Sequence, residues 1–580
     1  MHKYLCNPLP LPYRYQVKKN NADGVDVFRE AADPTLIRFK DRYYLFASMS
    51  GGFWYSTDLH TWDFKETLEL PIFDYAPDVH EVNGKMVFSA SRGEPCAFFA
   101  SEDPVSGLFA YVETTFPFWD PALFADDDGR TYFYWGCGNE HPLWGVEVNP
   151  ETFEPLGEKV AMLQAQHHRH GWERAGENNG GDTHPYIEGA FMNKYQGKYY
   201  LQYAAPGTEF NVYSDGVYVA DKPLGPFAYQ RHNPFSAKPG GFATGAGHGS
   251  TFQDTFGNYW HIATMRISVN ELFERRLGLF PCDFDANGTL YCNQNFADYP
   301  FPLPQGKRTD INRTAPLWHL LSYNKAATAS SHQAGHGPEQ STNEDIRTWW
   351  AADKTDTSPW YRLDLGSVCT VHAVQVNFAD HQVNPTPEWD MYDEADSHGR
   401  VIYTSVVKSL YGKPKQIGEL AYLLESSADG ENWLTLRDLT SVPQDCPHDL
   451  VIPGQAVEAR YIRISQLAQA VDGVAALSGV RVFGTGTGTP PAKVTAVTYS
   501  LSPEGLDMEL RWPSLPEADG YNVRYGIAPE KLYNSWQVFG RNALTLSMLN
   551  AGTDYYVAVD SFNENGVTAG DVIHAKPQPL

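Results

Sequence analysis

Short apolar segments recur in a constant setting along residues 30–305. Each segment is introduced by a polar or glycine turn and one or two aromatic residues, and each ends in small residues. The five copies begin at Asp41, Gly84, Gly129, Gly197 and Gly257. A degenerate repeat of about 40–50 residues, built only of short strands, is typical of propeller blades. The pattern therefore predicts five blades, and an array of β-sandwiches with chance similarity is the alternative.

A different pattern follows residue 305. Residues 317–485 contain longer strand-like runs such as Val371-His-Ala-Val-Gln-Val-Asn-Phe, and a Gly/Thr/Pro linker begins at Gly484. Beyond the linker, apolar and polar residues alternate with the period of a half-exposed strand. We predict an all-β chain with an N-terminal extension packing on the propeller (1–29), a five-bladed β-propeller (30–305), a medium-sized β-sandwich (317–485) and a small β-sandwich (490–580).

Composition excludes several classes of partner. The 580 residues carry 44 Lys+Arg against 70 Asp+Glu, a formal net charge of −26, and 14% of them are aromatic. Such a charge repels phosphate backbones and anionic lipid, so we expect no nucleic-acid partner. No apolar run approaches the roughly 20 residues that a membrane helix needs, so we expect no membrane insertion. The aromatic content also excludes a disordered chain.

The seven cysteines form no CxxC pair, which makes a thiolate zinc site an unfavourable interpretation. Cys282 and Cys292 flank Asp-Ala-Asn-Gly, a strong hairpin signal, and would face each other across two strands. Whether they form a disulfide or remain two buried thiols stays open.

Three carboxylates lie in apolar surroundings within the propeller segment. Asp33 lies in Ala-Ala-Asp-Pro-Thr-Leu-Ile, Asp120 in Phe-Trp-Asp-Pro-Ala-Leu-Phe, and Glu188 in Tyr-Ile-Glu-Gly-Ala-Phe-Met. A carboxylate with apolar flanks costs free energy unless it is paired or protonated, so such positions often mark function. A single Asp-Pro is usually a turn former. Two in the same phrase, together with a Glu-Gly in a third blade, indicate a catalytic group.

Eight motifs in chain order make residues 30–300 resemble glycoside hydrolase family 43. They are Ala32-Asp-Pro, Tyr55-Ser-Thr-Asp-Leu-His-Thr-Trp, Tyr75-Ala-Pro-Asp, Trp119-Asp-Pro-Ala-Leu-Phe-Ala-Asp-Asp-Asp-Gly, Ile187-Glu-Gly, Gly225-Pro-Phe, Gly247-His-Gly-Ser and Arg275-Arg-Leu-Gly-Leu-Phe-Pro. The resemblance implies a five-bladed propeller that inverts configuration at arabinofuranosides, xylosides and related sugars. It implies Asp33 as general base, Glu188 as general acid, and Asp120 as the residue that tunes and orients the acid.

Inversion explains why such a site needs separate carboxylates. A base activates water on one face of the sugar while an acid protonates the leaving oxygen on the other. The acid must stay protonated near its working pH, and a second anion and apolar neighbours both favour this. In this sequence Asp120 is the expected anion, and Tyr186, Phe191 and Trp119 are the expected apolar neighbours.

The resemblance also implies a cation and a substrate-binding arginine. His248, between two glycines, would lie on the propeller axis and help to hold a Ca²⁺ or Na⁺ ion, often through water; a neutral imidazole bonded within the channel is the alternative. Arg275 aligns with a substrate-contacting arginine, although the adjacent Arg276 is easily confused with it. We expect no organic cofactor.

Aromatic residues are the expected sugar platforms. Tyr75 stands where the family usually has tryptophan and is predicted to form a sugar-stacking wall. Trp54, Trp119 and Trp172 are further candidates, with a place in the core as the alternative for each. His184, four residues before Glu188, would reach the same pocket or else lie in solvent.

The remaining segments suggest how the chain meets its substrate. The polar, Gly-rich stretch 163–183 is predicted to wall off one end of the active-site funnel, which favours exo action. With Thr348-Trp-Trp-Ala-Ala-Asp, Trp360-Tyr-Arg-Leu-Asp-Leu-Gly and Ala459-Arg-Tyr-Ile-Arg-Ile, residues 317–485 resemble a discoidin (factor 5/8 C-type) domain with an insertion at 379–415. The resemblance implies a jelly-roll β-sandwich that is either a carbohydrate-binding module or a brace for the propeller. With Trp512-Pro and Thr553-Asp-Tyr-Tyr-Val-Ala-Val, residues 490–580 resemble a fibronectin type III domain, which implies an immunoglobulin-like β-sandwich and is usually a spacer.

Together these features predict an exo-acting, inverting glycoside hydrolase that removes terminal α-L-arabinofuranose, or β-D-xylose as second choice, from plant polysaccharide or oligosaccharide side chains. A β-D-galactofuranosidase of the same fold, a non-catalytic glycan-binding protein and a retaining fructosidase are the alternatives. We expect a monomer that meets oligosaccharide or polysaccharide substrate. The first residues lack a signal-peptide core, so either the protein is cytoplasmic or an export signal was removed; we expect a periplasmic or secreted protein.

Overall fold

The computed structural model describes residues 2–20, 24–67, 70, 75–91, 97–106, 108–113, 116–389, 410–415 and 418–576. These residues form strands joined by turns and short 3-10 helices, so the predicted all-β class is confirmed. Among them, no helix is long and apolar enough to cross a lipid bilayer.

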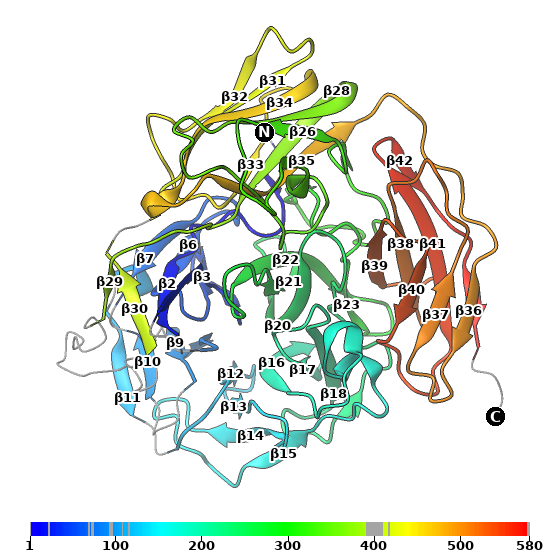
Figure 1. The fold of residues 1–580 in the computed structure, drawn as a ribbon. Helices are drawn as coiled ribbons and strands as arrows, with labels where there is room; N and C mark the ends of the chain where they lie inside the picture. The colour runs from blue at the N-terminus through cyan, green and yellow to red at the C-terminus, as the bar shows by residue number, and fades with distance from the viewer. Residues whose placement is uncertain are drawn as a thin grey trace.

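Five four-stranded antiparallel sheets follow one another along the first half of the chain (Figure 1). The first sheet contains β4 (Thr35–Phe39), β5 (Arg42–Phe46), β6 (Gly52–Ser56) and β7 (Asp63–Glu66); the second β8 (Asp78–Val82), β9 (Lys85–Ser89), β10 (Ala97–Ser101) and β11 (Ala110–Glu113); the third β12 (Ala122–Ala125), β13 (Thr131–Trp135), β14 (Leu143–Val148) and β15 (Val160–Leu163); the fourth β16 (Glu188–Tyr195), β17 (Lys198–Ala205), β18 (Ser214–Ala220) and β19 (Ala228–Tyr229); the fifth β20 (Thr244–Gln253), β21 (Tyr259–Arg266), β22 (Arg275–Phe284) and β23 (Leu290–Cys292). The five copies of the sequence repeat coincide with the second strand of each sheet.

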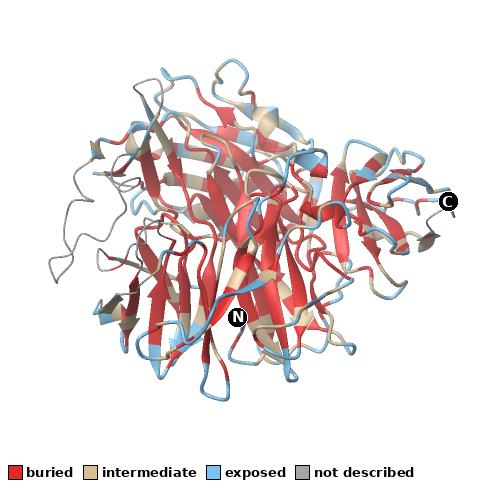
Figure 2. Cartoon of the chain, turned by 90° about the horizontal axis from the view of Figure 1, so that it is seen from below, coloured by how far each residue is buried: buried red, intermediate tan, exposed pale blue. Residues whose placement is uncertain are grey.

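The sheets form a closed ring. The first strand of each sheet contacts the first strand of the next, and β20 of the fifth sheet contacts β4 of the first. Most of the apolar core lies between neighbouring sheets, where buried aromatic and aliphatic side chains of adjacent sheets pack together. In Figure 2 the buried residues accordingly follow the strands of the ring. The first strands therefore surround the middle of the ring, where loop residues at their starts can meet.

The N-terminal segment packs on the ring at its closure. Strand β1 (Tyr4–Leu5) pairs with β24 (Phe301–Pro302), and Leu9, Leu11 and Tyr13 lie in the apolar cluster between the fifth and first sheets. A hairpin of β2 (Tyr15–Lys19) and β3 (Val25–Arg29) then leads directly into the start of the first sheet.

The second module is a nine-stranded antiparallel arrangement with its own apolar core. Its strands are β25 (His319–Leu320), β26 (Ala326–Ala329), β27 (Trp350–Ala351), β28 (Tyr361–Phe378), β31 (Ala421–Ser427), β32 (Leu434–Asp438), β33 (His448–Val451), β34 (Val457–Ala468) and β35 (Ala476–Thr485). Two further strands of this segment, β29 (Pro387–Glu388) and β30 (Tyr411–Pro414), extend the β2–β3 hairpin instead. The described part of the predicted insertion at 379–415 thus reaches the N-terminal hairpin.

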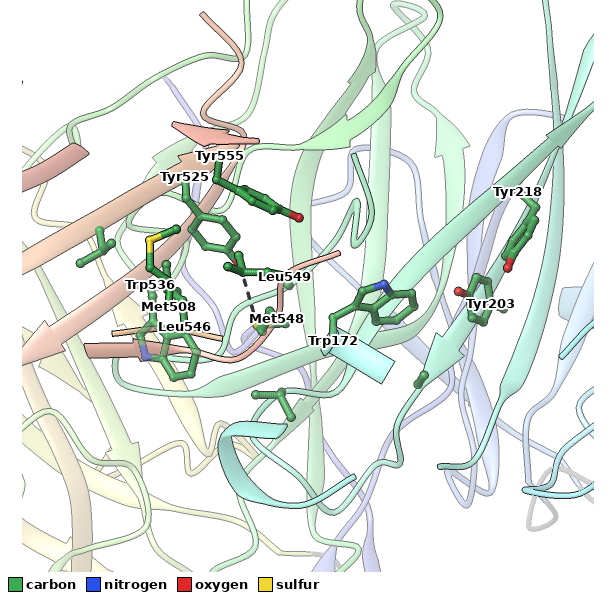
Figure 3. Packing of buried hydrophobic residues seen from close by; sticks show 14 of the residues in the cluster. Trp172, Tyr203, Tyr218, Met508, Tyr525, Trp536, Leu546, Met548, Leu549 and Tyr555 are labelled. Carbon is green, nitrogen blue, oxygen red and sulfur yellow. Dashed lines mark hydrogen bonds between the residues drawn. The ribbon is translucent and has the colours of Figure 1, made fainter. Parts of the chain in front are cut away.

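The third module contains two sheets. One has β36 (Thr498–Leu501), β37 (Met508–Arg511) and β40 (Ala543–Leu546); the other has β38 (Gly520–Gly526), β39 (Asn534–Phe539), β41 (Tyr555–Asn563), β42 (Gly566–Thr568) and β43 (Ile573–Ala575). Their buried side chains belong to the same apolar cluster as residues of the third and fourth sheets of the ring, with Trp172 among them (Figure 3). The third module is therefore joined to the ring through a continuous core.

Cys282 and Cys292 face each other across the predicted hairpin, as cross-strand partners of β22 and β23. Both are buried, and the structure holds them as free thiols.

Candidate active site

Each sheet of the ring places one residue in the left-handed region of backbone space at an equivalent position. These residues are Asp33 (φ 50°), Ala76 (φ 51°), Asp120 (φ 49°), Gly189 (φ 63°) and His248 (φ 44°). Each precedes by two positions the point where regular pairing of the first strand begins. Positive φ is costly for a residue with a side chain, and it is tolerated most readily by Asp, Asn, His and glycine. The first, third and fifth sheets thus bring Asp33, Asp120 and His248 to the middle of the ring.

Asp33 is buried and fully supplied with partners. Its backbone N–H donates to Thr264 Oγ1 at 2.8 Å, and Ser48 Oγ donates to its Oδ2 at 2.7 Å. Arg275 Nη1 and His248 Nδ1 lie 3.3 and 3.4 Å from its Oδ1. Burial alone would raise the pKa of Asp33, but the Arg275 guanidinium and the His248 ring outweigh it and hold that pKa below its ordinary value. Asp33 is therefore an anion at neutral pH, as a general base must be.

Asp120 has a similar frame but the opposite electrostatics. Ser91 Oγ donates to its Oδ1 at 3.1 Å, and the Gly189 N–H donates to its Oδ2 at 3.3 Å. Burial raises the pKa of Asp120 to about 7; the carboxylates of Glu188 and Asp33 add to this effect, and His248 opposes it. Asp120 therefore changes its charge close to neutral pH.

His248 lies between the two aspartates. Its Nδ1 is 3.4 Å from Asp33 Oδ1 and 3.6 Å from Asp120 Oδ2, and its backbone N–H donates to Asp215 Oδ1 at 2.7 Å. Burial alone would lower the pKa of His248, but these carboxylates raise it above its ordinary value. A Cβ at Gly189 would come within 2.8 Å of the imidazole. The glycine after Glu188 is thus required for the ring to fit.

Glu188, the predicted acid, directly precedes Gly189. Tyr213 Oη donates to its Oε1 at 2.6 Å, and Cys137 Sγ lies 3.0 Å from its Oε2. Burial, and then the neighbouring Glu188 carboxyl group, raise the pKa of Tyr213, so this hydroxyl remains a donor. A carboxylate oxygen of Asp120, the sulfur of Cys137 and a carboxylate oxygen of Glu188 all lie within 4.8 Å of one another. The acid and Asp120 are therefore direct neighbours, as the sequence motif implied.

Consecutive arginines on β22 point to different partners. Arg275 lies between Asp33, Thr208 and Glu30: its Nη1 is 3.0 Å from Thr208 Oγ1, and its Nη2 pairs with the buried Glu30 carboxylate. Arg276 Nε instead donates to His448 of the second module at 3.0 Å. Alternation along the strand thus assigns the site to Arg275 and the module interface to Arg276.

The aromatic candidates divide between the site and the core. Tyr75 and Trp119 directly precede the left-handed residues of their sheets, at the position that Glu188 occupies in the fourth, and Trp119 is 46% exposed. Trp54 is completely buried in the cluster that closes the ring, so the prediction of a sugar platform is corrected to a core residue. Trp172 is likewise buried, in the core shared with the third module.

His184 lies apart from these contacts. It is exposed, and its ring centroid is 4.9 Å from that of His167 in the preceding loop. No contact between His184 and the three carboxylates is found among the described residues.

The stretch 163–183 is held by the third module. The Gly171 N–H donates to the Leu549 carbonyl at 2.7 Å, His170 Nδ1 lies 3.1 Å from Asn550 Oδ1, and Arg174 Nη1 donates to Asp507 at 3.2 Å. The stretch is therefore a docking segment along much of its length, because its polar groups bind the neighbouring module. That role explains its composition without a polar pocket of its own.

Sequence reasoning missed the residues that support the carboxylates. Ser48 and Ser91 hold Asp33 and Asp120, yet both stand at the ends of copies of the repeat, where small residues recur. Glu30 and Asp215, which hold Arg275 and His248, have no local signal in the sequence because their partners are distant along the chain. The repeat thus offered a signal for the serines only.

The groups around His248 determine how this ring could hold the cation that the resemblance implies. Nδ1 of His248 faces two carboxylates, and no hydrogen-bond partner for Nε2 is found in the described part of the chain. A raised pKa keeps the ring protonated up to a higher pH than a free imidazole, and Ca²⁺ prefers six to eight oxygen ligands. The donor set therefore fits only a cation that meets this ring through water.

Replacement of Asp120 by asparagine should move the alkaline limb of the rate profile to lower pH. With a pKa of about 7, Asp120 is an anion above neutrality, where it disfavours a second negative charge on the neighbouring acid. Asparagine removes this charge and its titration near pH 7, so the fall in rate on the alkaline side should begin at lower pH. Profiles of kcat/KM between about pH 5 and 9 measure the shift. An unchanged alkaline limb would contradict this role.

Comparison with known proteins gives the following similarities. Residues 27–290, from β3 to the start of β23, match the model of the family described as Glycosyl hydrolases family 43. A Beta-xylosidase of Xylanibacter ruminicola is 29% identical over 23% of this chain and 44% of its own length. An Arabinoxylan arabinofuranohydrolase of Paenibacillus polymyxa is 31% identical over 26% of this chain and 23% of its own length. A Beta-D-galactofuranosidase of Aspergillus niger is 31% identical over 26% of this chain and 38% of its own length. The chain thus spans less than half the length of these relatives.

Proposed function

We propose that this protein is an exo-acting, inverting glycoside hydrolase that removes terminal α-L-arabinofuranose from plant polysaccharide or oligosaccharide side chains. Terminal β-D-xylose is the second choice. The observation that carries the proposal is the group of Asp33, Asp120 and Glu188 around His248 and beside Arg275, inside the stretch that matches family 43. The names of the similar xylosidase and arabinofuranohydrolase support the choice of sugar.

The geometry suits an inverting reaction. Asp33, held as an anion by Arg275, accepts the proton of the attacking water, and Glu188 donates a proton to the leaving oxygen. Tyr213 and Cys137 orient the Glu188 carboxyl by contacting one oxygen each. Arg275 holds the base and offers its guanidinium to sugar hydroxyls.

The architecture that we propose follows from the same observations. The ring of five sheets is a five-bladed β-propeller of residues 30–305, with residues 1–29 as an extension that packs on it. The module of residues 317–485 is a discoidin-like sandwich, and residues 490–580 form a fibronectin type III-like sandwich. Contacts of Arg276 with His448 favour a bracing role for the discoidin-like module, beside the carbohydrate binding that the resemblance implies.

Nitrophenyl glycosides test the proposal. We expect release of nitrophenol from the α-L-arabinofuranoside or from the β-D-xyloside. We also expect release of terminal sugar from arabinoxylan. A preference for the β-D-galactofuranoside would select the galactofuranosidase alternative, which the name of the similar Aspergillus niger protein supports. Cleavage confined to internal chain sites would refute exo action. Binding of oligosaccharide without release of any sugar would establish a non-catalytic glycan-binding protein.

Proton NMR of the first-formed anomer tests the stereochemistry. We expect inversion, as the resemblance to family 43 implies; the anomer decides, because retaining glycosidases also use two carboxylates. Retention of configuration would contradict the mechanism that the resemblance to family 43 implies, and it would favour a retaining fructosidase. We further propose that the protein is a monomer, which size-exclusion chromatography would check. We propose that it lies in the periplasm or outside the cell, which cell fractionation would check, and that its partner is the glycan.

Chelation should lower the activity partly. We propose that a Ca²⁺ or Na⁺ ion, if bound on the axis, meets His248 through water, while Asp33 and Asp120 hold the ring directly. Because the carboxylates position the ring without the ion, treatment with EDTA should reduce kcat/KM without abolishing it, and added Ca²⁺ should restore it. Complete and reversible loss would contradict this arrangement, and no loss would show that the activity needs no Ca²⁺.

A further inference from the structure

A hydrogen bond between two tyrosine hydroxyl groups links the second module to the candidate active site. Tyr75 Oη and Tyr411 Oη form a hydrogen bond of 2.8 Å, although the two residues lie 336 positions apart in the chain. Tyr411 belongs to β30, a strand of the second module's segment, and is only 4% exposed. Its ring is part of the apolar cluster between the first and second sheets of the ring. Tyr411 is therefore built into the ring rather than attached beside it.

Tyr75 is itself fixed between the two aspartates. The Ser91 N–H donates to its carbonyl at 2.9 Å, and the N–H of the next residue, Ala76, donates to Ser48 Oγ at 2.7 Å. Ser91 and Ser48 are the serines that hold Asp120 and Asp33. Tyr75 also occupies the position in the second sheet that Glu188 occupies in the fourth. Its backbone is thus locked by the site, and its hydroxyl is held from the second module.

The strand that carries Tyr411 is positioned by pairing and by a cation. Lys18 of β2 is the cross-strand partner of Tyr411, and its Nζ lies 5.7 Å from the Tyr411 ring and 5.8 Å from the Phe273 ring. The same Nζ pairs with Glu271 at 3.0 Å. Two aromatic rings and an ion pair therefore converge on Lys18, in the strand that pairs with β3, which leads to Glu30 and Asp33.

We propose that Tyr411 is a positioning residue that fixes the Tyr75 ring as a wall of the sugar-binding pocket. This inference rests on the proposed function, and it makes the discoidin-like module part of the pocket. Tyr75 would contact the terminal sugar with its ring, while Tyr411 holds the ring at the angle that the sugar requires. Loss of the hydrogen bond leaves both aromatic rings present, but the Tyr75 ring is no longer held at one angle.

Steady-state kinetics of Tyr411→Phe test this on the nitrophenyl glycoside that the wild-type protein hydrolyses best. We expect KM to rise about two- to tenfold, the effect of one neutral hydrogen bond, with kcat nearly unchanged. Tyr75→Phe should give the same change, and the double variant should be no worse than either single variant, because both remove one interaction. An unchanged KM, or additive effects, would overturn the proposal.

Tyr422→Phe is the matched control. Tyr422 is a buried tyrosine of the same module whose hydroxyl donates to Asp449, away from Tyr75. It should lower thermal stability without changing KM. If it raises KM as Tyr411→Phe does, the effect reports general loosening of the module and the proposal fails.

Calorimetry separates this inference from the proposed function. Titration of the protein with an arabinose-substituted xylo-oligosaccharide needs no turnover, so it serves even if the wild-type protein hydrolyses no glycoside. Weaker binding by Tyr411→Phe in about the same ratio would support the wall. Equal Kd values for the wild-type and variant proteins would overturn it, whatever the outcome for catalysis.

Discussion

Replacement of Asp33 by asparagine should lower kcat by about 10²–10⁴, the usual scale for loss of an acid–base group. The amide cannot accept a proton from water, and it also removes the charge that Arg275 and His248 now face. Asparagine nearly conserves volume and tolerates the left-handed backbone of this position (φ 50°). Steady-state rates on the best nitrophenyl glycoside measure the loss.

The control for Asp33 is a thermal melt. Ser48 Oγ and the Thr264 hydroxyl can still bond to the amide oxygen and the backbone N–H of asparagine. We therefore expect a folded protein with a midpoint close to that of the wild type. Activity within tenfold of wild type in a folded variant would exclude Asp33 as the base.

Replacement of Glu188 by glutamine should have an effect of similar size that depends on the leaving group. Glutamine keeps the contact with Tyr213 but has no proton to give to the departing oxygen. Natural linkages have poor leaving groups and should lose about 10²–10⁴ in kcat, whereas activated aryl glycosides need little protonation and should lose far less. A series of aryl glycosides of graded leaving-group pKa measures this slope.

Asp33→Asn supplies the contrast, since loss of the base should affect every leaving group alike. A Glu188→Gln variant that is equally impaired on natural and activated substrates would not have lost its acid. It would then be assigned a role in binding or in supporting Asp120.

The fold was predictable as far as its repeat was local. The turn-aromatic-apolar phrase marks the second strand of every sheet, because that strand is buried and its preceding turn requires glycine or a polar residue. The pairing of β30 with β2 was not predictable. Those strands lie about 400 residues apart in the chain, and neither carries a pattern that names its partner.

The candidate site was predictable where its chemistry is carried by motifs. Asp33, Asp120 and Glu188 meet as expected, and Arg275 could be told from Arg276 only once the strand direction was known. Of the three expected apolar neighbours of the acid, only Phe191 is buried. Tyr186 and Trp119 are each 46% exposed, and the pKa raised toward neutrality is that of Asp120. Electrostatics of this kind depend on distances across the ring, which no local pattern encodes.

The core shared between the ring and the third module limits how such a protein can evolve. Trp172 lies in one apolar cluster with Met508 and Trp536, and the backbone around it bonds to Leu549 (Figure 3). A gene rearrangement that removed or exchanged the last module would leave this apolar face open to water, at about 25 cal/mol for each square ångström exposed. Recombination at the Gly/Thr/Pro linker, which looks in the sequence like a natural boundary for shuffling, would therefore be selected against. We expect the three modules to be inherited together, as one unit of descent.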